Sequence, residues 1–380
     1  MTDWPVKTLG SICEVFDDGD WIESKDQAPT GVRLVQTGNV GEGVFKDRSD
    51  KARFISEATF TRLRCTEIIP GDLLVSRLPD PVGRACLIPD TGSKMITAVD
   101  CTIMRPRKEV MSPQFLVAAT QTGSYREQVR AKITGTTRDR ISRSNLAEVQ
   151  VAVPPLEEQK RIVALLDAAT ASITELTACY NQARTHANNL FTSALRDALE
   201  GNPDWLSGAL DYLCEVEYGT RVTRKRDGGT KYPVYGGGGA TFNLDDFNRQ
   251  DQMIVSRFAM SEECVRFVPG KFFLNDSGLT VRTRDEKLMT QEFLDQQLIA
   301  RSTEIYATAR GTAQKNMDMT MFRNMQLAYP ESLEEQKRIV ARLDSMRAKT
   351  SEMVAAYDAK LTAAKNLRQS ILESAFAGEL

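Results

Sequence analysis

The segment LEEQKRIVALLD at residues 156–167 recurs at residues 333–344 as LEEQKRIVARLD, with eleven of twelve positions identical. The two copies are 177 positions apart, and a proline stands shortly before each of them. Pro155 suits the first turn of a helix, and the carboxylates of Glu157 and Glu158 suit the positive end of a helix dipole. We therefore predict two helices that begin in the same way, far apart in the chain.

Behind each start, apolar residues recur in alternating steps of four and three, which is typical of a coiled-coil seam. The first copy has Ile162, Leu166, Ala169, Ile173, Leu176, Tyr180, Ala183, Ala187, Leu190 and Ala194 at these positions. The second copy has Ile339, Leu343, Met346, Thr350, Met353, Tyr357, Lys360, Ala364, Leu367 and Ile371. We predict that the two helices pair along this seam as an antiparallel coiled coil. The alternative is that each helix only caps its own module.

The residues ahead of each helix repeat as well. DWPVKTLGSICEV at 3–15 aligns with DWLSGALDYLCEV at 204–216, and Val-Ser-Arg ends an apolar stretch at 75–77 and again at 255–257. A third pair of segments begins GTTRDR at Gly135 and GTAQKN at Gly311. We place domains at 1–153 (module 1), 154–202, 203–330 (module 2) and 331–380. The predicted fold is α+β: two mixed modules and two long helices, related by a pseudo-two-fold internal repeat.

The composition is that of a globular protein, with 41% hydrophobic and 26% charged residues. No apolar run approaches the ~20 residues that a membrane helix needs, and the first residues lack the apolar core of a signal peptide. Seven cysteines without a CxxC pair indicate reduced thiols, so we expect a cytoplasmic protein. Because the net charge is −2, any nucleic-acid binding must depend on local clusters of charge.

The sequence gives no sign of a catalytic centre. Its one histidine, His186, falls outside the predicted seam, and no GxxxxGKS/T phosphate loop is present. There is no methyltransferase signature of Asn or Asp followed by Pro-Pro-aromatic, and no glycine-rich loop suited to S-adenosylmethionine. We therefore predict a chain that has no catalytic residue, no metal site and no cofactor of its own.

The order of these elements, the two LEEQKRIV starts, the paired Val-Ser-Arg strands and YPVYGGGG at 232–239 closely resemble the specificity subunit of type I restriction–modification systems. The resemblance implies two target recognition domains that each read one half of a split DNA site. It implies two antiparallel helices that fix the spacing and dock two DNA methyltransferase subunits, which restriction subunits then join. S-adenosylmethionine, ATP and Mg would belong to those partner subunits. Module 1 has no counterpart of YPVYGGGG, so the role of that loop does not carry over to it.

Module 1 holds a basic segment at residues 124–146, with six Arg or Lys and two acidic residues. Phosphate contacts position a protein on DNA and base contacts specify the sequence, so such a segment is a candidate for both. The DNA-binding candidates here are Lys132, Thr136, Thr137, Arg138, Arg140 and Arg143. The alternative is a solvated basic helix followed by a turn.

Module 2 has a weaker counterpart and one further basic stretch. Around GTAQKN the candidates are Arg310, Gln314, Lys315 and Asn316, of which the two amides could hydrogen-bond bases. The stretch 219–231 and the glycines after it add Arg221, Arg224, Lys225 and Tyr235, although a mobile hairpin tip would have similar composition. Arg77 and Arg257, at the ends of the Val-Ser-Arg strands, could reach guanine, or could instead form structural ion pairs.

A rival hypothesis from another class is a structural adaptor whose repeated helices join two protein partners and whose modules bind protein. The helices support both hypotheses equally. The basic segments and the whole-chain resemblance favour DNA, and salt-dependent binding to duplex DNA separates the two.

Overall fold

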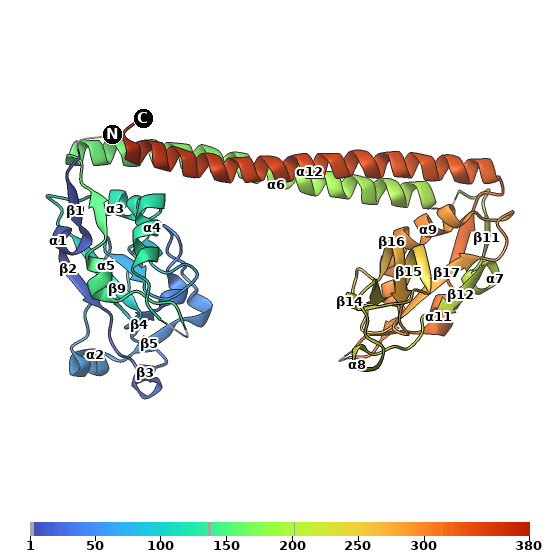
Figure 1. Ribbon diagram of the computed structural model, residues 1–380, viewed down its shortest axis with the longest axis horizontal. Helices are drawn as coiled ribbons and strands as arrows, with labels where there is room; N and C mark the ends of the chain where they lie inside the picture. The colour runs from blue at the N-terminus through green and yellow to red at the C-terminus, as the bar shows by residue number, and fades with distance from the viewer. Residues whose placement is uncertain (1–3, 136–137, 201, 313) are drawn as a thin grey trace. The chain divides into compact units, whose positions relative to one another are not determined.

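The computed structural model of the protein (Figure 1) describes residues 4–135, 138–200, 202–312 and 314–380. The chain forms two compact units, which are Met1–Cys179 with Lys360–Leu380 (unit 1) and Tyr180–Ala359 (unit 2). Each unit contains one module and a part of both long helices. The unit boundaries therefore cut through the helices, because each part of a helix packs on the module beside it.

The described residues of unit 1 form three small sheets. One pairs β1 (Val6–Thr8) with β10 (Gln150–Ala152), so the start and the end of module 1 lie side by side. The second has the order β2 (Cys13–Asp18), β9 (Cys101–Pro106), β6 (Leu73–Ser76) and β7 (Ala85–Leu87). The third has the order β3 (Gln27–Ala28), β5 (Arg53–Ile55), β4 (Val32–Val35) and β8 (Met95–Thr97). Every residue of β4 and β6 is buried, as expected of strands covered on both faces.

The helices of module 1 are short. They are α1 (Leu9–Ile12), α2 (Glu57–Leu63), α3 (Pro113–Ala119), α4 (Gly123–Ala131) and α5 (Arg143–Ala147), with single 3-10 turns η1 (Ser24–Asp26), η2 (Thr37–Asn39) and η3 (Ser49–Lys51). Helix α3 begins after the N-cap residue Ser112, whose side chain accepts a hydrogen bond from the Phe115 N–H. Pro113 occupies its first turn, where a proline is well tolerated.

Unit 2 repeats the same plan with a larger sheet. β11 (Leu206–Ala209) pairs with β20 (Gln326–Tyr329), as β1 pairs with β10. The main sheet has the order β12 (Cys214–Tyr218), β17 (Gly278–Thr283), β15 (Arg249–Ser256), β16 (Val265–Leu274), β13 (Tyr232–Gly236) and β14 (Gly239–Leu244). A separate ribbon joins β18 (Ala309–Arg310) to β19 (Asn316–Met317). The helices are α7 (Leu210–Leu213), α8 (Arg224–Asp227), α9 (Gln291–Ala300), α10 (Ser302–Ala307) and α11 (Met319–Arg323).

The two long helices are α6 (Leu156–Leu199) and α12 (Leu333–Ala377). In unit 1, Arg161 near the start of α6 donates a 2.6 Å hydrogen bond to the carbonyl of Leu380, just beyond the end of α12. In unit 2, Tyr180 lies against Tyr357 with 6.3 Å between ring centroids, and the Arg347 guanidinium lies 5.1 Å from the centroid of the Phe191 ring. In these contacts, residues with higher numbers in α6 meet residues with lower numbers in α12, so the two helices are antiparallel. The predicted antiparallel pairing and the α+β repeat are confirmed.

The predicted seam is buried only in part. Ile162, Ile173, Ala187, Leu343 and Ala364 are buried, and so is Thr350, whose hydroxyl donates to the Met346 carbonyl at 3.0 Å. Four other seam positions are 42% to 51% exposed, namely Leu176, Leu190, Met353 and Leu367. A straight helix drifts about 20° per heptad from a strict seven-residue repeat, so a heptad stripe leaves the line of contact. The helices therefore pair along a seam of which some positions are buried and others stay half-exposed.

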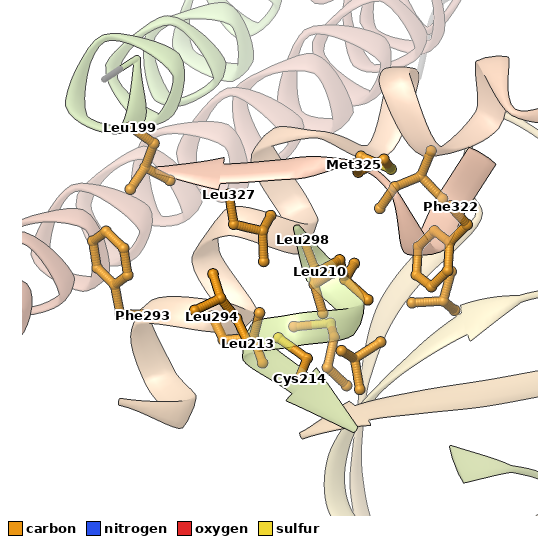
Figure 2. Close-up of a cluster of buried hydrophobic side chains, with 14 of the residues drawn as sticks. Leu199, Leu210, Leu213, Cys214, Phe293, Leu294, Leu298, Phe322, Met325 and Leu327 are labelled. Atoms are coloured by element: carbon orange, nitrogen blue, oxygen red, sulfur yellow. The ribbon is translucent and has the colours of Figure 1, made fainter. Parts of the chain in front are cut away.

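Both long helices also complete the core of each module. In unit 1, Ile162 and Ala375 join a cluster with Phe115. In unit 2, Figure 2 shows Leu199 at the end of α6 in one cluster with Phe293, Leu298 and Leu327. The helices therefore pair and also cap the modules, so the alternative that each helix only caps its own module is wrong.

By length and composition alone, α6 could cross a membrane. It is the one such helix in the part of the chain that the structure describes. Asp167 and Glu175 interrupt the apolar residues of α6, so the helix holds no continuous apolar run of that length. A single helix of this kind does not make a membrane protein, and α6 is paired with α12 in both units.

Candidate nucleic-acid interface

Both modules contain the same glycine loop, residues 134–140 in module 1 and 310–316 in module 2. Thr134 and Arg140 exchange two backbone hydrogen bonds of 2.8 and 2.9 Å, and Arg310 pairs with Asn316 in the equivalent way. Gly135 and Gly311 have φ of +133° and +115°, a region that L side chains rarely adopt. A Cβ on either glycine would lie within 3.0 Å of the backbone carbonyl oxygen three residues later. The glycine is thus required for the loop to close.

The tips of the two loops differ in chemistry. In module 1 the described part of the tip carries Arg138, and in module 2 it carries Gln314 and Lys315, all exposed. The Lys315 ammonium lies 4.5 Å from the centroid of the Tyr306 ring. Thr136 and Thr137, two of the predicted DNA contacts, lie outside the described residues.

The Val-Ser-Arg strand ends lie beside these loops. The Ile141 N–H donates to the Arg77 carbonyl at 3.2 Å, and the Met317 N–H donates to the Arg257 carbonyl at 2.9 Å. The structure therefore joins, in each module, two predicted DNA-binding segments that are more than 50 residues apart in the chain. Sequence reasoning had treated them separately.

Arg77 is turned into module 1. Its side chain is 6% exposed, its Nη2 lies 3.2 Å from Asp18 Oδ2, and it also donates to the Val99 carbonyl. Burial lowers the pKa of Arg77, although the charge of Asp18 opposes that shift. The ion pair weighed as the alternative for this residue is therefore present. We leave Arg77 out of the proposed interface.

Arg257 has different surroundings at the equivalent position in module 2. Its guanidinium lies 4.7 Å from the centroid of the Tyr218 ring and 4.6 Å from that of Phe258. No ion-pair partner for it occurs among the described residues. Stacking on aromatic rings orients a guanidinium while it leaves the N–H groups at its edge free to donate. Arg257 is therefore a half-exposed, oriented donor.

The glycine turn between β13 and β14 lies against the same strand end. Ser256 Oγ donates to the Gly237 carbonyl at 2.9 Å, and Arg266 Nη2 donates to it at 3.1 Å. A Cβ on Gly237 would overlap the Phe258 carbonyl oxygen, whereas one on Gly238 would meet nothing within 4 Å. Hydrogen bonds to the Gly237 carbonyl therefore fix the base of the turn, while the space around Gly238 at its tip is empty.

The glycine loop completes this group of segments in module 2. The Met260 N–H donates to the Lys315 carbonyl at 2.9 Å, and the Ala259 N–H donates to Asn316 Oδ1 at 3.3 Å. Tyr235, predicted to contact DNA, packs edge-on against Phe272 with 5.6 Å between centroids and is half-buried. Its ring therefore supports the sheet from within.

The remaining candidate cations fall into two groups. Four of them form ion pairs at or near the surface, Lys132 with Glu148, Arg140 with Asp100, Arg143 with Asp17, and Arg310 with Asp318. The exposed residues without an ion pair in the described segments are Arg138, Arg221, Arg224 and Lys225. Exposed ion pairs contribute only about 0–1 kcal/mol, so a phosphate can compete for the paired cations as well.

One basic hollow escaped the sequence analysis. A cavity of about 300 Å³ in module 1 is lined by Arg33, Arg48, Lys51 and Arg53 together with the polar side chains of Gln36 and Asn39. Arg33 is buried and pairs with the exposed Asp47, whereas the other three cations are exposed. Asp47 and Asp50 interrupt these cations in the sequence, so no basic run was visible. Only the fold of β4 and β5 brings them together.

All seven cysteines are free thiols, and six of them are buried. Burial raises the pKa of Cys13 and of Cys86 to about 12, which makes these thiols unreactive. Across the residues that the structure describes, no group of three or more His, Cys, Asp or Glu side chains is placed to hold a metal ion.

Comparison with known proteins gives one family. The model of the type I restriction modification DNA specificity domain matches residues 1–183 and again 202–363. A chain from work on complex assembly and conformational transition of the type I R-M system aligns with a TM-score of 0.80 at 20% identity, over 99% of this chain and 98% of that chain. The HsdS subunit from Thermoanaerobacter tengcongensis aligns with a TM-score of 0.60 at 20% identity, over 100% and 98%. A search of curated proteins found no match. At this identity the structural likeness shows the fold alone, whereas the family model covers most of the sequence.

Proposed function

The chain belongs to the type I restriction–modification DNA specificity family, and from this premise we propose that it is the non-catalytic subunit that reads the DNA target of such a complex. Each module reads one half of a bipartite site on double-stranded DNA. The long helices set the distance between the two half-sites and bind two methyltransferase subunits. Restriction subunits then join this complex. S-adenosylmethionine, ATP and Mg are then held by those partners, and the complex acts in the cytoplasm.

One observation carries this proposal: the same glycine loop stands beside the same strand end in both modules, but the two tips carry different side chains. Two modules that recognise different DNA sequences need the same backbone framework but different side chains where they contact the bases. Arg138 favours guanine or a phosphate, whereas Gln314 is an amide that pairs well with adenine. The two half-sites should therefore differ in sequence.

Module 2 adds a second argument through Arg257. An arginine that is oriented by Tyr218 and has no ion pair among the described residues can donate two parallel hydrogen bonds to the O6 and N7 atoms of guanine. The adjoining open glycine turn lets backbone approach the duplex closely. Arg221, Arg224 and Lys225 supply positive charge for phosphates.

Module 1 has its own source of positive charge. Arg138 and the basic hollow formed by Arg48, Lys51 and Arg53 carry cations that are exposed and have no ion pair in the described segments. These cations support phosphate contacts by module 1, although the net charge of the chain is −2.

The exposed seam residues support the docking of two identical partners. Leu176 and Met353 are 177 positions apart in the repeat, and so are Leu190 and Leu367. Leu176 and Leu367 belong to unit 1, and Met353 and Leu190 belong to unit 2. Each unit thus presents the same pair of half-exposed apolar side chains on its helices. A surface that occurs twice in one chain suits two copies of one partner.

The adaptor hypothesis remains the competing function, and DNA titration separates the two. The purified chain, with its methyltransferase partner, should bind duplex DNA with an affinity that falls steeply as salt rises. An adaptor whose modules bind protein would show no such binding, and that result would reject the proposed function.

A further inference from the structure

The repeated LEEQKRIV motif contains one polar residue that is fully buried in both units. In unit 1 this residue is Gln159, which has no solvent exposure. Its Nε2 donates to the carbonyls of Val110 at 2.9 Å and Pro154 at 2.8 Å. Its Oε1 accepts a 2.7 Å hydrogen bond from the Ser112 N–H. All three contacts are with backbone groups, and two of them lie in module 1.

Unit 2 repeats this arrangement around Gln336, which is likewise fully buried. Its Nε2 donates to the carbonyls of Leu288 at 2.8 Å and Pro330 at 2.9 Å, and its Oε1 accepts from the Thr290 N–H at 2.9 Å. The two sets of partners are equivalent positions of the repeat. The contacts depend on backbone atoms, so they persist although the modules differ in sequence.

The module end of each contact is the start of a helix. Ser112 and Thr290 are the N-cap residues of α3 and α9, and their side chains accept from the N–H groups of Phe115 and Phe293. Both phenylalanine rings are completely buried in the core of their module. The glutamine therefore joins the first turn of a long helix to the first residue of a core helix of the module. We call each set of three hydrogen bonds a glutamine latch.

The remaining contact between module and helix start includes apolar packing in both units, and in unit 2 also hydrogen bonds of Gln296 with Asp344 and Arg347. Ile162 and Leu166 in unit 1, and Ile339 and Leu343 in unit 2, pack into the module cores. Apolar contacts hold surfaces together but have little directional preference. The three hydrogen bonds of each latch do have direction, and a buried group left without a partner is strongly disfavoured. The latch is thus the element best suited to define an angle.

We propose that Gln159 and Gln336 are positioning residues that fix the angle of each recognition module on its own helix and so restrict the gap length that the complex accepts. This inference rests on the proposed function. Adding one base pair to the gap moves a half-site by about 3.4 Å and rotates it by about 35° around the duplex. A module whose angle is free over a comparable range would accept more than one gap.

The test uses the full chain in complex with its methyltransferase subunits. The substrates are duplexes that carry both half-sites and differ in the gap by single base pairs, and methyl transfer is measured on each. The test variant is Gln336→Met, which keeps the size of the side chain and removes its hydrogen bonds. We expect methylation at gaps one base pair longer or shorter to rise at least tenfold relative to the native gap, with the half-site bases unchanged.

Gln297→Met is the matched control. Gln297 is also fully buried in unit 2, where it donates to the Ala328 carbonyl at 2.9 Å and accepts from Arg301 Nε at 3.0 Å. All of these partners belong to module 2, so this variant loses buried hydrogen bonds without loosening the module from the helix. It should keep the single native gap. A general loss of stability would affect both variants alike.

Gln159→Met is the second test variant, and its unit has additional supports. There, α12 holds module 1 through three further hydrogen bonds, from Arg368 and Gln369 to Gln121 and from the Gly123 N–H to Glu373. Unit 2 has such supports as well, because Gln296 of α9 donates to Asp344 Oδ1 at 3.1 Å and accepts from Arg347 Nη2 at 2.7 Å on α12. This variant should therefore relax the gap by an amount similar to that of Gln336→Met. If Gln336→Met does not fold, Gln159→Met decides.

A folded latch variant that stays as strict for gap length as the Gln297→Met control overturns the positioning role. If the unmodified complex methylates duplexes irrespective of their half-sites, the proposed function fails and the inference fails with it. These two failures are distinguishable, because the first concerns gap length alone and the second concerns the half-site bases.

Discussion

The Arg257 guanidinium lies 4.7 Å from the centroid of the Tyr218 ring, at the place where module 1 sets Asp18 against Arg77. Tyr218 and Asp18 are both the last residue of the strand that follows the first short helix of their module. At this strand end an aspartate pairs with the arginine of module 1, whereas in module 2 a tyrosine stacks on an arginine that has no ion-pair partner among the described residues. The same Val-Ser-Arg motif therefore has different surroundings in the two modules.

Replacing Arg257 by alanine should relax sequence recognition at one position of the half-site that module 2 reads. A bidentate contact to a base contributes about 1–3 kcal/mol of discrimination, so selectivity at that position should fall about 5- to 150-fold. Methylation of duplexes with each of the four bases at every half-site position would measure this effect.

Arg77→Ala is the matched comparison for Arg257→Ala. It should lower the free energy of unfolding by about 2 kcal/mol, because it leaves Asp18 without its buried partner. It should leave the base preferences of both half-sites unchanged. A half-site change from Arg77→Ala, or none from Arg257→Ala, would contradict the contrast between the two arginines.

Arg138→Ala should weaken DNA binding equally for all sequences if the side chain contacts a phosphate. The slope of log affinity against log salt concentration would then become less steep by about one. Titration of specific and random duplexes at several salt concentrations measures both quantities. Lost selectivity at one half-site with an unchanged slope would instead identify Arg138 as a base reader.

Gly311→Ala should disrupt the glycine loop of module 2. The positive φ and the close Gln314 carbonyl oxygen both oppose a Cβ, and the left-handed backbone alone costs about 1–2 kcal/mol. Recognition of one half-site should be lost while the chain stays folded. Gly270→Ala is the control, because Gly270 also has a positive φ of +71°, a Cβ there meets nothing within 4 Å, and the residue lies outside the proposed interface. Equal effects of the two variants would refute the importance of the loop.

Asp295 on α9 predicts a pH dependence of stability in unit 2. Burial raises the pKa of Asp295 to about 6, while a hydrogen bond from Gln291 opposes the shift. Because the folded protein binds this proton more tightly than the unfolded chain, the contribution of Asp295 is present at low pH and is lost as pH rises from about 4 to about 6. Asp295→Asn should therefore stabilise the protein at pH 7 by up to about 2 kcal/mol and have little effect near pH 4. Denaturant unfolding at both pH values measures this, and an equal effect at the two would contradict it.

Lengthening both long helices tests their role as a spacer. Seven residues inserted after Cys179 in α6 and seven after Ala359 in α12 preserve the pairing and add about 10 Å of helix. The accepted gap should grow by about three base pairs of 3.4 Å, with both half-sites unchanged. Sequencing of the methylated sites would show the new gap, and an unaltered gap would exclude the helices as the spacer.

Much of this architecture could be predicted from the sequence because the repeat is written into it. The equal starts at Leu156 and Leu333 predicted two like helices, and the glycines at 135 and 311 marked equivalent loops. These are local signals, in which a residue type is demanded by backbone geometry or by helix capping. Such signals can be recognised in a single sequence, even when the residues that contact them in the folded protein are unknown.

Features that depend on distant partners could not be predicted. The burial of Arg77 requires Asp18, which lies 59 positions earlier, and the basic hollow forms only when β4 and β5 bring Arg33, Arg48 and Arg53 together. Gln159 lay inside the repeated motif, yet its role depends on backbone atoms near residue 111 that no pattern singles out. Sequence periodicity also overstated the buried seam at Leu176 and Leu190.

The central claim is that this chain gives a type I complex its split DNA target, and a map of methylated bases across the source genome tests it most directly. Single-molecule sequencing with and without the chain compares every methylated motif at once. The account predicts that one motif disappears without the chain, and that this motif has two different half-sites separated by a gap of constant length. A methylation pattern that is identical in the two samples, in cells where the partner methyltransferase is active, would contradict the account.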